Sequence, residues 1–248
     1  ILNYCRIKYA KVWNYGFPTC SVNENLNETA VALIDASPTI SNCEFKDLDY
    51  GISCYRASNP VISNNTMVNI KYTPICISGS SNPTITGITF TNIGWRAIGL
   101  LGGNVCLNGT IKKRDIAGFT NITYVLLSDM TINSGTNVNV EPGVVIKVYK
   151  QSGSGSIFVD GGFRTDGTSL LPVVFTSIKD DNQGNPLDSN GDGNATTPAP
   201  GDWGSIKYRS TSDDGYCLLD YTTIKFAGYT NEGGATFENA GGQLKNSI

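Results

Sequence analysis

One pattern is written three times between residues 36 and 101. The segment Ser37–Asn42 (SPTISN) returns as Asn59–Asn64 (NPVISN) and again as Asn82–Gly87 (NPTITG), with prolines 22 and 23 residues apart. The apolar residues that follow keep the same step, in the columns Ile40/Ile62/Ile85, Phe45/Met67/Phe90, Leu48/Ile70/Ile93, Tyr50/Tyr72/Trp95 and Ile52/Ile75/Ile98. A unit of this length cannot bury its own apolar face, so the period indicates a solenoid whose units stack on one another.

The spacing inside each unit indicates which solenoid this is. Apolar residues, mostly Ile, Val and Phe, stand two or three positions apart among Asn, Gly, Ser and Thr, which is typical of short strands and tight turns. The Leu-x-x-Leu-x-Leu frame of a leucine-rich repeat is absent. We therefore predict an all-β fold, a right-handed parallel β-helix with three short strands in each rung of about 22 residues. In these features the sequence resembles the pectate-lyase-like β-helix superfamily, which hosts lyases, hydrolases, adhesins and inert stalks.

We expect a single domain over residues 1–248. The regular spacing is interrupted in three places, where we predict loop insertions at about 11–30, 102–123 and 179–202.

A longer repeat joins the two ends of the chain. Leu2–Ala10 matches Leu219–Ala227 at an offset of 217 residues with five of nine positions identical, and Leu33–Cys43 matches Phe237–Ser247 at an offset of 204. The Asn-rich insertion absorbs the difference between the two offsets. We predict that the rung 218–248 superposes on the rung 1–43. The chain is interpreted as a piece of a longer protein in which further copies of this unit stack end to end.

Composition favours a secreted rod over a cytosolic enzyme. Charged residues make up 16% of the chain, the net charge is −3 and glycine occurs 28 times, a low-charge and turn-rich balance. Lys and Arg are scattered, so we expect no nucleic-acid partner, and no apolar run reaches the ~20 residues that span a bilayer. The segments Gly201–Ile206 and Val140–Val144 resemble parts of the β-helices of large secreted bacterial surface proteins. That resemblance implies an extracellular or cell-surface location.

The chain has seven cysteines without a C-x-x-C pair, and no histidine, so a zinc site has no support. Cys43, Cys54 and Cys76 fall within the repeat, where a thiol packs as a small apolar group. We expect mostly free, buried cysteines, although Cys20, in an insertion, could pair with a neighbour.

The best candidate site is an Asp-rich loop. Asp188, Asn190 and Asp192 place oxygen side chains at alternate positions before Gly193, as in the first half of a calcium-binding EF-hand loop. The match then fails, because position 12 is Ala199 instead of a bidentate Glu. Asn194 and flanking carboxylates could complete the set, which leads us to predict a structural Ca²⁺ site with the ligands Asp188, Asn190, Asp192, Asn194 and Asp202, and with Asp180 or Asp181 as further candidates. The competing interpretation is a solvated loop of Asp-Gly turns.

The sequence offers little for catalysis, and we assign no catalytic residue. Without histidine, no Ser-His or Cys-His pair is possible. Polygalacturonase-like β-helix hydrolases carry an Arg-Ile-Lys segment, which here is Arg6–Lys8, but its repeat counterpart Thr223–Lys225 lacks the arginine. Pectate-lyase-like enzymes use carboxylate-bound calcium with a basic residue, yet the repeat places no acidic column on successive rungs.

Two functions remain open. The first is a non-catalytic structural or adhesive module of a large extracellular or cell-surface repeat protein, able to form a fibre or stalk and to bind polysaccharide. The second is a fragment of a polysaccharide lyase or glycoside hydrolase of the β-helix type. Exposed Trp and Tyr side chains could stack on sugar rings in either case.

Overall fold

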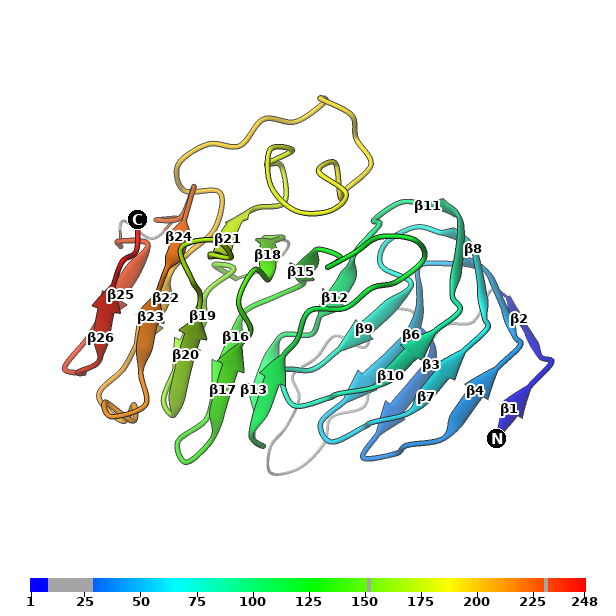
Figure 1. Cartoon of the computed structure of the whole chain (residues 1–248), viewed down its shortest axis with the longest axis horizontal. Helices are drawn as coiled ribbons and strands as arrows, with labels where there is room; N and C mark the ends of the chain where they lie inside the picture. Colours follow the sequence, from blue (N-terminus) through cyan, green and yellow to red (C-terminus); the bar gives the residue numbers. More distant parts are fainter. Residues whose placement is uncertain (9–28, 151–152, 230–231) are drawn as a thin grey trace.

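The computed structural model describes residues 1–8, 29–150, 153–229 and 232–248. Over these residues the chain forms strands and no helix, and all of the strand pairs are parallel. Figure 1 shows the strands stacked along the long axis of the molecule, with the N-terminus near one end and the C-terminus near the other. The predicted all-β parallel solenoid is confirmed.

The strands form five sheets, which we call A to E. Sheet A contains β1 (Leu2–Asn3), β4 (Thr39–Ser41), β7 (Val61–Ser63) and β10 (Thr84–Thr86). Sheet B contains β2 (Arg6–Lys8), β5 (Glu44–Leu48), β8 (Thr66–Ile70) and β11 (Thr89–Ile93). Sheet C has eight strands, β3 (Thr29–Ile34), β6 (Tyr50–Tyr55), β9 (Ile75–Ile77), β12 (Ile98–Leu100), β15 (Tyr124–Leu126), β18 (Val145–Val148), β21 (Val173–Ser177) and β24 (Thr222–Ile224).

Sheets D and E belong to the C-terminal half. Sheet D contains β13 (Gly103–Val105), β16 (Met130–Ile132), β19 (Ile157–Val159), β22 (Ile206–Tyr208) and β25 (Ala235–Phe237). Sheet E contains β14 (Gly109–Ile111), β17 (Asn137–Val140), β20 (Gly162–Asp166), β23 (Leu218–Asp220) and β26 (Gln243–Lys245). Sheet C therefore runs through both halves of the rod, whereas A and B are replaced by D and E.

The repeat columns stack in register, as the sequence predicts. Ile62 of β7 lies between Ile40 and Ile85, and Met67 of β8 lies between Phe45 and Phe90. The other strand columns pair in the same way, Leu48/Ile70/Ile93 in sheet B and Ile52/Ile75/Ile98 in sheet C. These residues line the interior of the coil, where their burial provides most of the stabilisation that short strands lack on their own.

The turns explain why Asn and Gly recur in the repeat. Asn42, Asn64 and Gly87 occupy equivalent turns and all have positive φ, a conformation that Gly adopts without strain and Asn tolerates. A second asparagine row, on the outside of sheet B, forms a hydrogen-bond ladder, because Asn92 donates to Asn69 at 2.8 Å and Asn69 to Asp47 at 2.7 Å. The polar part of the repeat thus sets the corners of the coil.

The range 102–123, predicted as a loop insertion, is a loop only in its second part. Its first part contains β13 and β14, which start sheets D and E, so the coil continues through it. After β12 the chain turns within two residues, whereas six residues separate β9 from β10, so the next strand lies on a different face. The apolar spacing shows this corner as an interruption that begins at residue 102, but it does not show that the following strands lie on new faces.

The remaining loop, residues 112–123, lies against the end of sheet A. Arg114 donates from Nη1 to the Pro83 carbonyl and from Nη2 to Asn82 Oδ1, both at 2.8 Å. A pocket of about 310 Å³ remains between β10 and this loop. Asp115 is the one carboxylate among its lining residues, and it accepts a hydrogen bond from the Asn121 amide.

The cysteines follow the expectation in part. Cys5, Cys43, Cys54, Cys76 and Cys217 form no disulfide, and all but Cys5 are buried. Cys106 is disulfide-bonded, so it is an exception to the expectation of mostly free cysteines. Cys20 and residues 11–28 of the first predicted insertion lie outside the described residues, while residues 29 and 30 belong to β3.

Candidate metal site

A long loop connects β21 to β22 across the outer side of the rod, and the predicted insertion 179–202 falls inside it. The loop is fastened to turns that are distant in the sequence. The Asn185 amide donates to Thr123 Oγ1 at 2.8 Å, and Arg96 donates from its amide to the Ser189 carbonyl at 2.9 Å. Because partners some 60 to 90 residues away hold the loop, its side chains take fixed places over sheet C.

Three carboxylates of this loop come together. Asp181, Asp188 and Asp192 each have an oxygen within 4.8 Å of the others. Asp188 holds the turn, since its two oxygens accept the amides of Asp192 at 3.1 Å and Gly193 at 3.2 Å. Three negative charges this close repel one another, so the cluster needs positive charge.

Several oxygens of the cluster have no hydrogen-bond donor. Both carboxylate oxygens of Asp181, Oδ1 of Asp192 and the amide oxygen of Asn190 are buried and unpaired. Buried acceptors without partners are rare in folded proteins and costly, because they lose water and gain nothing in return. A group of unpaired oxygens beside three carboxylates fits a hard cation such as Ca²⁺, which takes about six to eight oxygen ligands.

Lys147, on the strand beneath the loop, provides positive charge to the cluster. Lys147 of β18 is fully buried, and its Nζ donates to the Leu187 carbonyl in the loop. Burial lowers the pKa of Lys147, while the carboxylates of Asp181, Asp180 and their neighbours oppose that shift. The same crowding acts on Asp181, whose pKa is raised by burial and by Asp188 and Asp192, although Lys147 acts against the rise.

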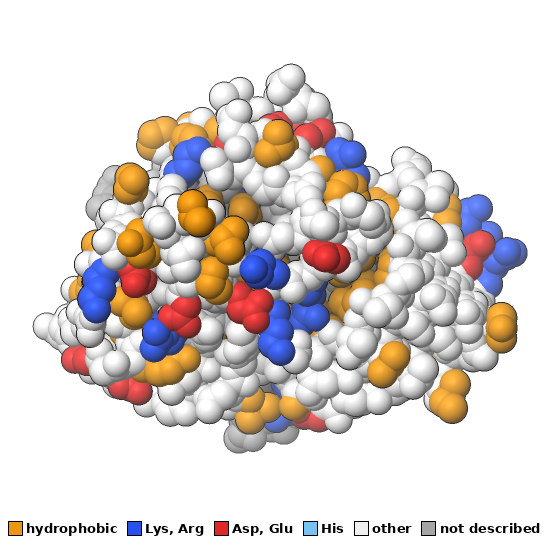
Figure 2. Space-filling model, in the orientation of Figure 1, with side chains coloured by type: hydrophobic (Ala, Val, Ile, Leu, Met, Phe, Trp, Pro, Cys, Tyr) orange, Lys and Arg blue, Asp and Glu red, His pale blue; other side chains and the backbone are white. Residues whose placement is uncertain are grey.

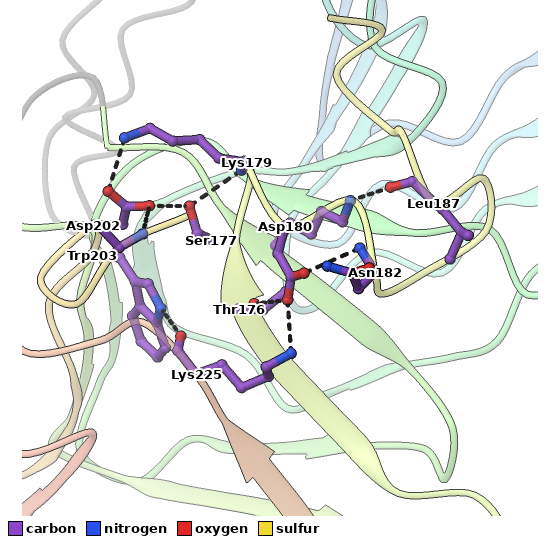
Figure 3. Close-up of polar contacts among 11 residues, drawn as sticks. Thr176, Ser177, Lys179, Asp180, Asn182, Leu187, Asp202, Trp203 and Lys225 are labelled. Carbon is purple, nitrogen blue, oxygen red and sulfur yellow. Dashed lines mark hydrogen bonds and ion pairs between the residues drawn. The ribbon is translucent and has the colours of Figure 1, made fainter. Parts of the chain in front are cut away.

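Two further networks anchor the base and the end of the loop (Figure 3). Asp180 is fully buried and accepts from Thr176 Oγ1 at 2.6 Å and from Lys225 Nζ at 3.2 Å. Burial alone would raise the pKa of Asp180, but its hydrogen bonds outweigh that effect and hold the pKa below the usual range.

At the other end, Asp202 accepts from Ser177 Oγ at 2.6 Å and from Lys179 Nζ at 2.8 Å. Its pKa is also lowered, because these bonds outweigh the effect of burial. Trp203 follows, buried, with its Nε1 donating to the Lys225 carbonyl at 2.7 Å. These contacts fix where the loop leaves and re-enters the coil.

The structure therefore separates the predicted ligands into two groups. Asp188, Asn190 and Asp192 lie together, and Asp181 is the flanking carboxylate that joins them. Asp202 belongs to the Lys179 network instead, and Asn194 is exposed. Sequence reasoning missed Lys147, whose one signal is a charged residue within the apolar strand β18.

Other residues considered from the sequence lie elsewhere. Arg6 is on β2, at the end of sheet B, and its Nε pairs with Glu44 at 2.7 Å. Among the aromatic residues, Tyr72 and Trp95 pack against each other with ring centroids 4.9 Å apart, and Trp203, Tyr55 and Tyr208 are buried. Tyr229 is exposed, with Lys150 Nζ 3.2 Å from its ring centroid. On the face drawn in Figure 2, acidic and basic side chains are interspersed.

Comparison with known families agrees with the fold. Residues 29–170, more than half of the chain, match the family described as right handed beta helix region. Comparisons with curated proteins and with solved structures gave no match. Within the described residues, no helix has the length and hydrophobicity needed to cross a bilayer.

Proposed function

Because the chain belongs to the right-handed beta helix family, we propose that it is a non-catalytic structural module, a stiff rod in a large extracellular or cell-surface protein. The observation that carries this proposal is the continuous eight-stranded sheet C, whose apolar columns stay in register along the rod. Repeated parallel strands make a stiff spacer from little sequence information, since each rung needs only its neighbours. The disulfide at Cys106 supports an oxidising, extracellular compartment.

Calcium has a structural role in this proposal. The ion would bind Asp181, Asp188, Asp192 and the amide oxygen of Asn190, the group that combines carboxylates with unpaired buried oxygens. It would neutralise repelling charges and hold the loop against sheet C. Extracellular calcium modules need only weak affinity, about 0.1 to 1 mM, because the ion is abundant there.

The calcium proposal predicts a loss of binding in the Asp181→Asn/Asp192→Asn variant. Isothermal titration calorimetry should give a calcium heat signature for the wild type and at least about a tenfold weaker one for the variant, because two of the anionic ligands are gone. Asn194→Ala is the matched control and should bind as the wild type does, since Asn194 is exposed. Burial raises the pKa of Asp181, so protons compete with the ion and affinity should fall as the pH drops toward that pKa. Absence of binding at millimolar calcium would contradict the proposed calcium site.

The rival function is a polysaccharide lyase or hydrolase. One observation favours it, because carboxylates and a lysine of lowered pKa lie together on the rod. Lys147, however, is fully buried and its Nζ is engaged with the Leu187 carbonyl, so a sugar cannot reach it while the loop is in place. A proton acceptor must come within hydrogen-bond distance of the substrate.

The rod proposal predicts no turnover of glycans. A panel of pectins, alginates and related polysaccharides, with and without calcium, should give neither reducing ends nor unsaturated products above background. A known lyase and a known hydrolase serve as positive controls for the two assays. Turnover that disappears in Lys147→Met, Arg6→Ala or Lys8→Ala would support the enzyme function and contradict the proposal of a non-catalytic rod. Binding without turnover would support an adhesive role. Replacing the exposed Tyr229 would then be the first step in locating the contact.

A further inference from the structure

The last rung of the rod reproduces the first rung on different sheets. From this we infer that the C-terminal edge, formed by β24, β25 and β26, is a docking surface for residues 45–248 of a second copy of this chain, with the last rung of the first copy in the place of residues 1–44 of the second. In that arrangement sheets A, B and C of the second copy continue sheets E, C and D of the first. The inference rests on the proposed rod and adds to it the partner and the geometry of the joint.

Strand pairing is the first equivalence. The inward residue of β1 lies beside the inward residue of β4, and the corresponding residues of β23 and β26 pair at the same positions. The first-rung pairs are Leu2 with Ile40 and Asn3 with Ser41, and the last-rung pairs are Leu219 with Leu244 and Asp220 with Lys245. These are the same positions that the offsets of 217 and 204 residues connect in the sequence.

The turns are the second equivalence. Residues with positive φ that are not glycine recur at matched positions, the pairs being Tyr4 with Tyr221, Asp35 with Asn239 and Asn42 with Asn246. A side-chain hydrogen bond recurs as well, from Asn42 Nδ2 to Asn3 Oδ1 and from Asn246 Nδ2 to Asp220 Oδ1, each at 2.9 Å. A shared apolar spacing alone would not place strained turns and their hydrogen bonds at the same positions. The two rungs therefore share one conformation.

The matched strands lie on different sheets. β1 and β4 belong to sheet A, and their equivalents β23 and β26 belong to sheet E. β2 of sheet B corresponds to β24 of sheet C, and β3 of sheet C to β25 of sheet D. Each strand of the first rung therefore has its equivalent on the neighbouring face of the coil in the last rung. This displacement results from the change of corner after β12.

Burial indicates that the C-terminal edge resembles an uncovered interior rung. Ile40, covered by β7, is 1% exposed, whereas its equivalent Leu244 is 58% exposed. Leu33, covered by β6, is 7% exposed, whereas its equivalent Phe237 is 37% exposed. Strands like β5, β6 and β7 placed on β24, β25 and β26 would bury these side chains and pair the free edge groups.

The point of entry for the second copy is also defined. The Ile248 amide donates to the Thr222 carbonyl at 2.9 Å, as the Glu44 amide donates to the Cys5 carbonyl at 2.8 Å. Ile248 thus occupies the place of Glu44 at the start of β5. A second copy joined so that its residue 45 follows Ile248 would continue the coil without a change of register.

The test is an extended chain, residues 1–248 followed by residues 45–248 of a second copy, with one engineered cysteine pair. Lys245→Cys in the first copy and Ser63→Cys in the second should become neighbours, because Ser41, the equivalent of Lys245, lies beside Ser63. In-register neighbours of a parallel pair lie within disulfide range. After mild oxidation and alkylation of the remaining thiols, proteolytic digestion and mass spectrometry should find the two engineered cysteine peptides linked in nearly all of the protein, and reductant should release them.

The matched control keeps Ser63→Cys and moves its partner to Thr236→Cys on β25, which the sheet assignment places on another face. That pair should give no linked peptides beyond those of the parent without engineered cysteines. Equal cross-linking of both pairs, or none of the Lys245 pair, would overturn the inference. An extended chain whose circular dichroism lacks the strand signal of the single unit would overturn it too. Because the cross-link measures geometry only, the result is independent of the glycan assay that tests the rod itself.

Discussion

The Ile62→Asn variant should be less stable than the wild type by at least about 3 kcal/mol. Ile62 is fully buried at the centre of sheet A, between Ile40 and Ile85. The substitution removes apolar packing from the interior of the coil and leaves an amide there with no partner of its own. Each of these two changes destabilises the folded state, and the single substitution causes both. Equilibrium unfolding in urea measures the loss as a lower midpoint.

The neighbouring residue supplies the control. Val61 is on the same strand but is 43% exposed, because successive residues of a strand face opposite sides. Val61→Asn should change the stability by less than about 1 kcal/mol. If both variants lost stability equally, the assignment of an inward column to Ile62 would be wrong, whatever the total loss.

The regular part of the fold could be predicted because it depends on nearest neighbours. In a solenoid each column residue contacts its equivalents one rung away, so the repeated spacing of Ile40, Ile62 and Ile85 already contains the contact. The replacement of sheets A and B by D and E could not be predicted in this way. It depends on the two-residue corner after β12, which the sequence shows only as an interruption of the regular spacing.

The candidate site could likewise be predicted from the sequence only where it depends on local contacts. Asp188, Asn190 and Asp192 could be selected from the sequence because a tight loop brings alternate residues together locally. Which flanking carboxylate joins them depends on how the loop lies on the coil, and the structure selects Asp181 over Asp202. Lys147 is 34 residues away from Asp181 in sequence, and only the stacking of β18 under the loop brings the two together. The metal itself stays a prediction.

The Lys147→Met variant is expected to be destabilised by about 1 to 3 kcal/mol when calcium is chelated. Lys147 is the fully buried cation next to the half-buried carboxylates, and removing it leaves them with less positive charge, although Arg96 still pairs with Asp188 at 3.5 Å. Methionine keeps most of the side-chain volume, so packing changes little. The loss should shrink in millimolar calcium, because a divalent ion on Asp181, Asp188 and Asp192 replaces the missing positive charge and binds the folded state alone.

Thermal unfolding of the variant and the wild type, each in chelator and in calcium, separates the two contributions. Lys179→Met is the control, since Lys179 pairs with Asp202 in the other network and its side chain is 40% exposed. An ion pair of that exposure contributes about 1 kcal/mol or less, and its loss should not depend on calcium. If Lys147→Met lost the same stability with and without calcium, Lys147 and the metal site would be energetically independent. Unchanged stability in chelator would mean that the buried ammonium does not compensate the cluster, which would contradict the electrostatic account of the loop.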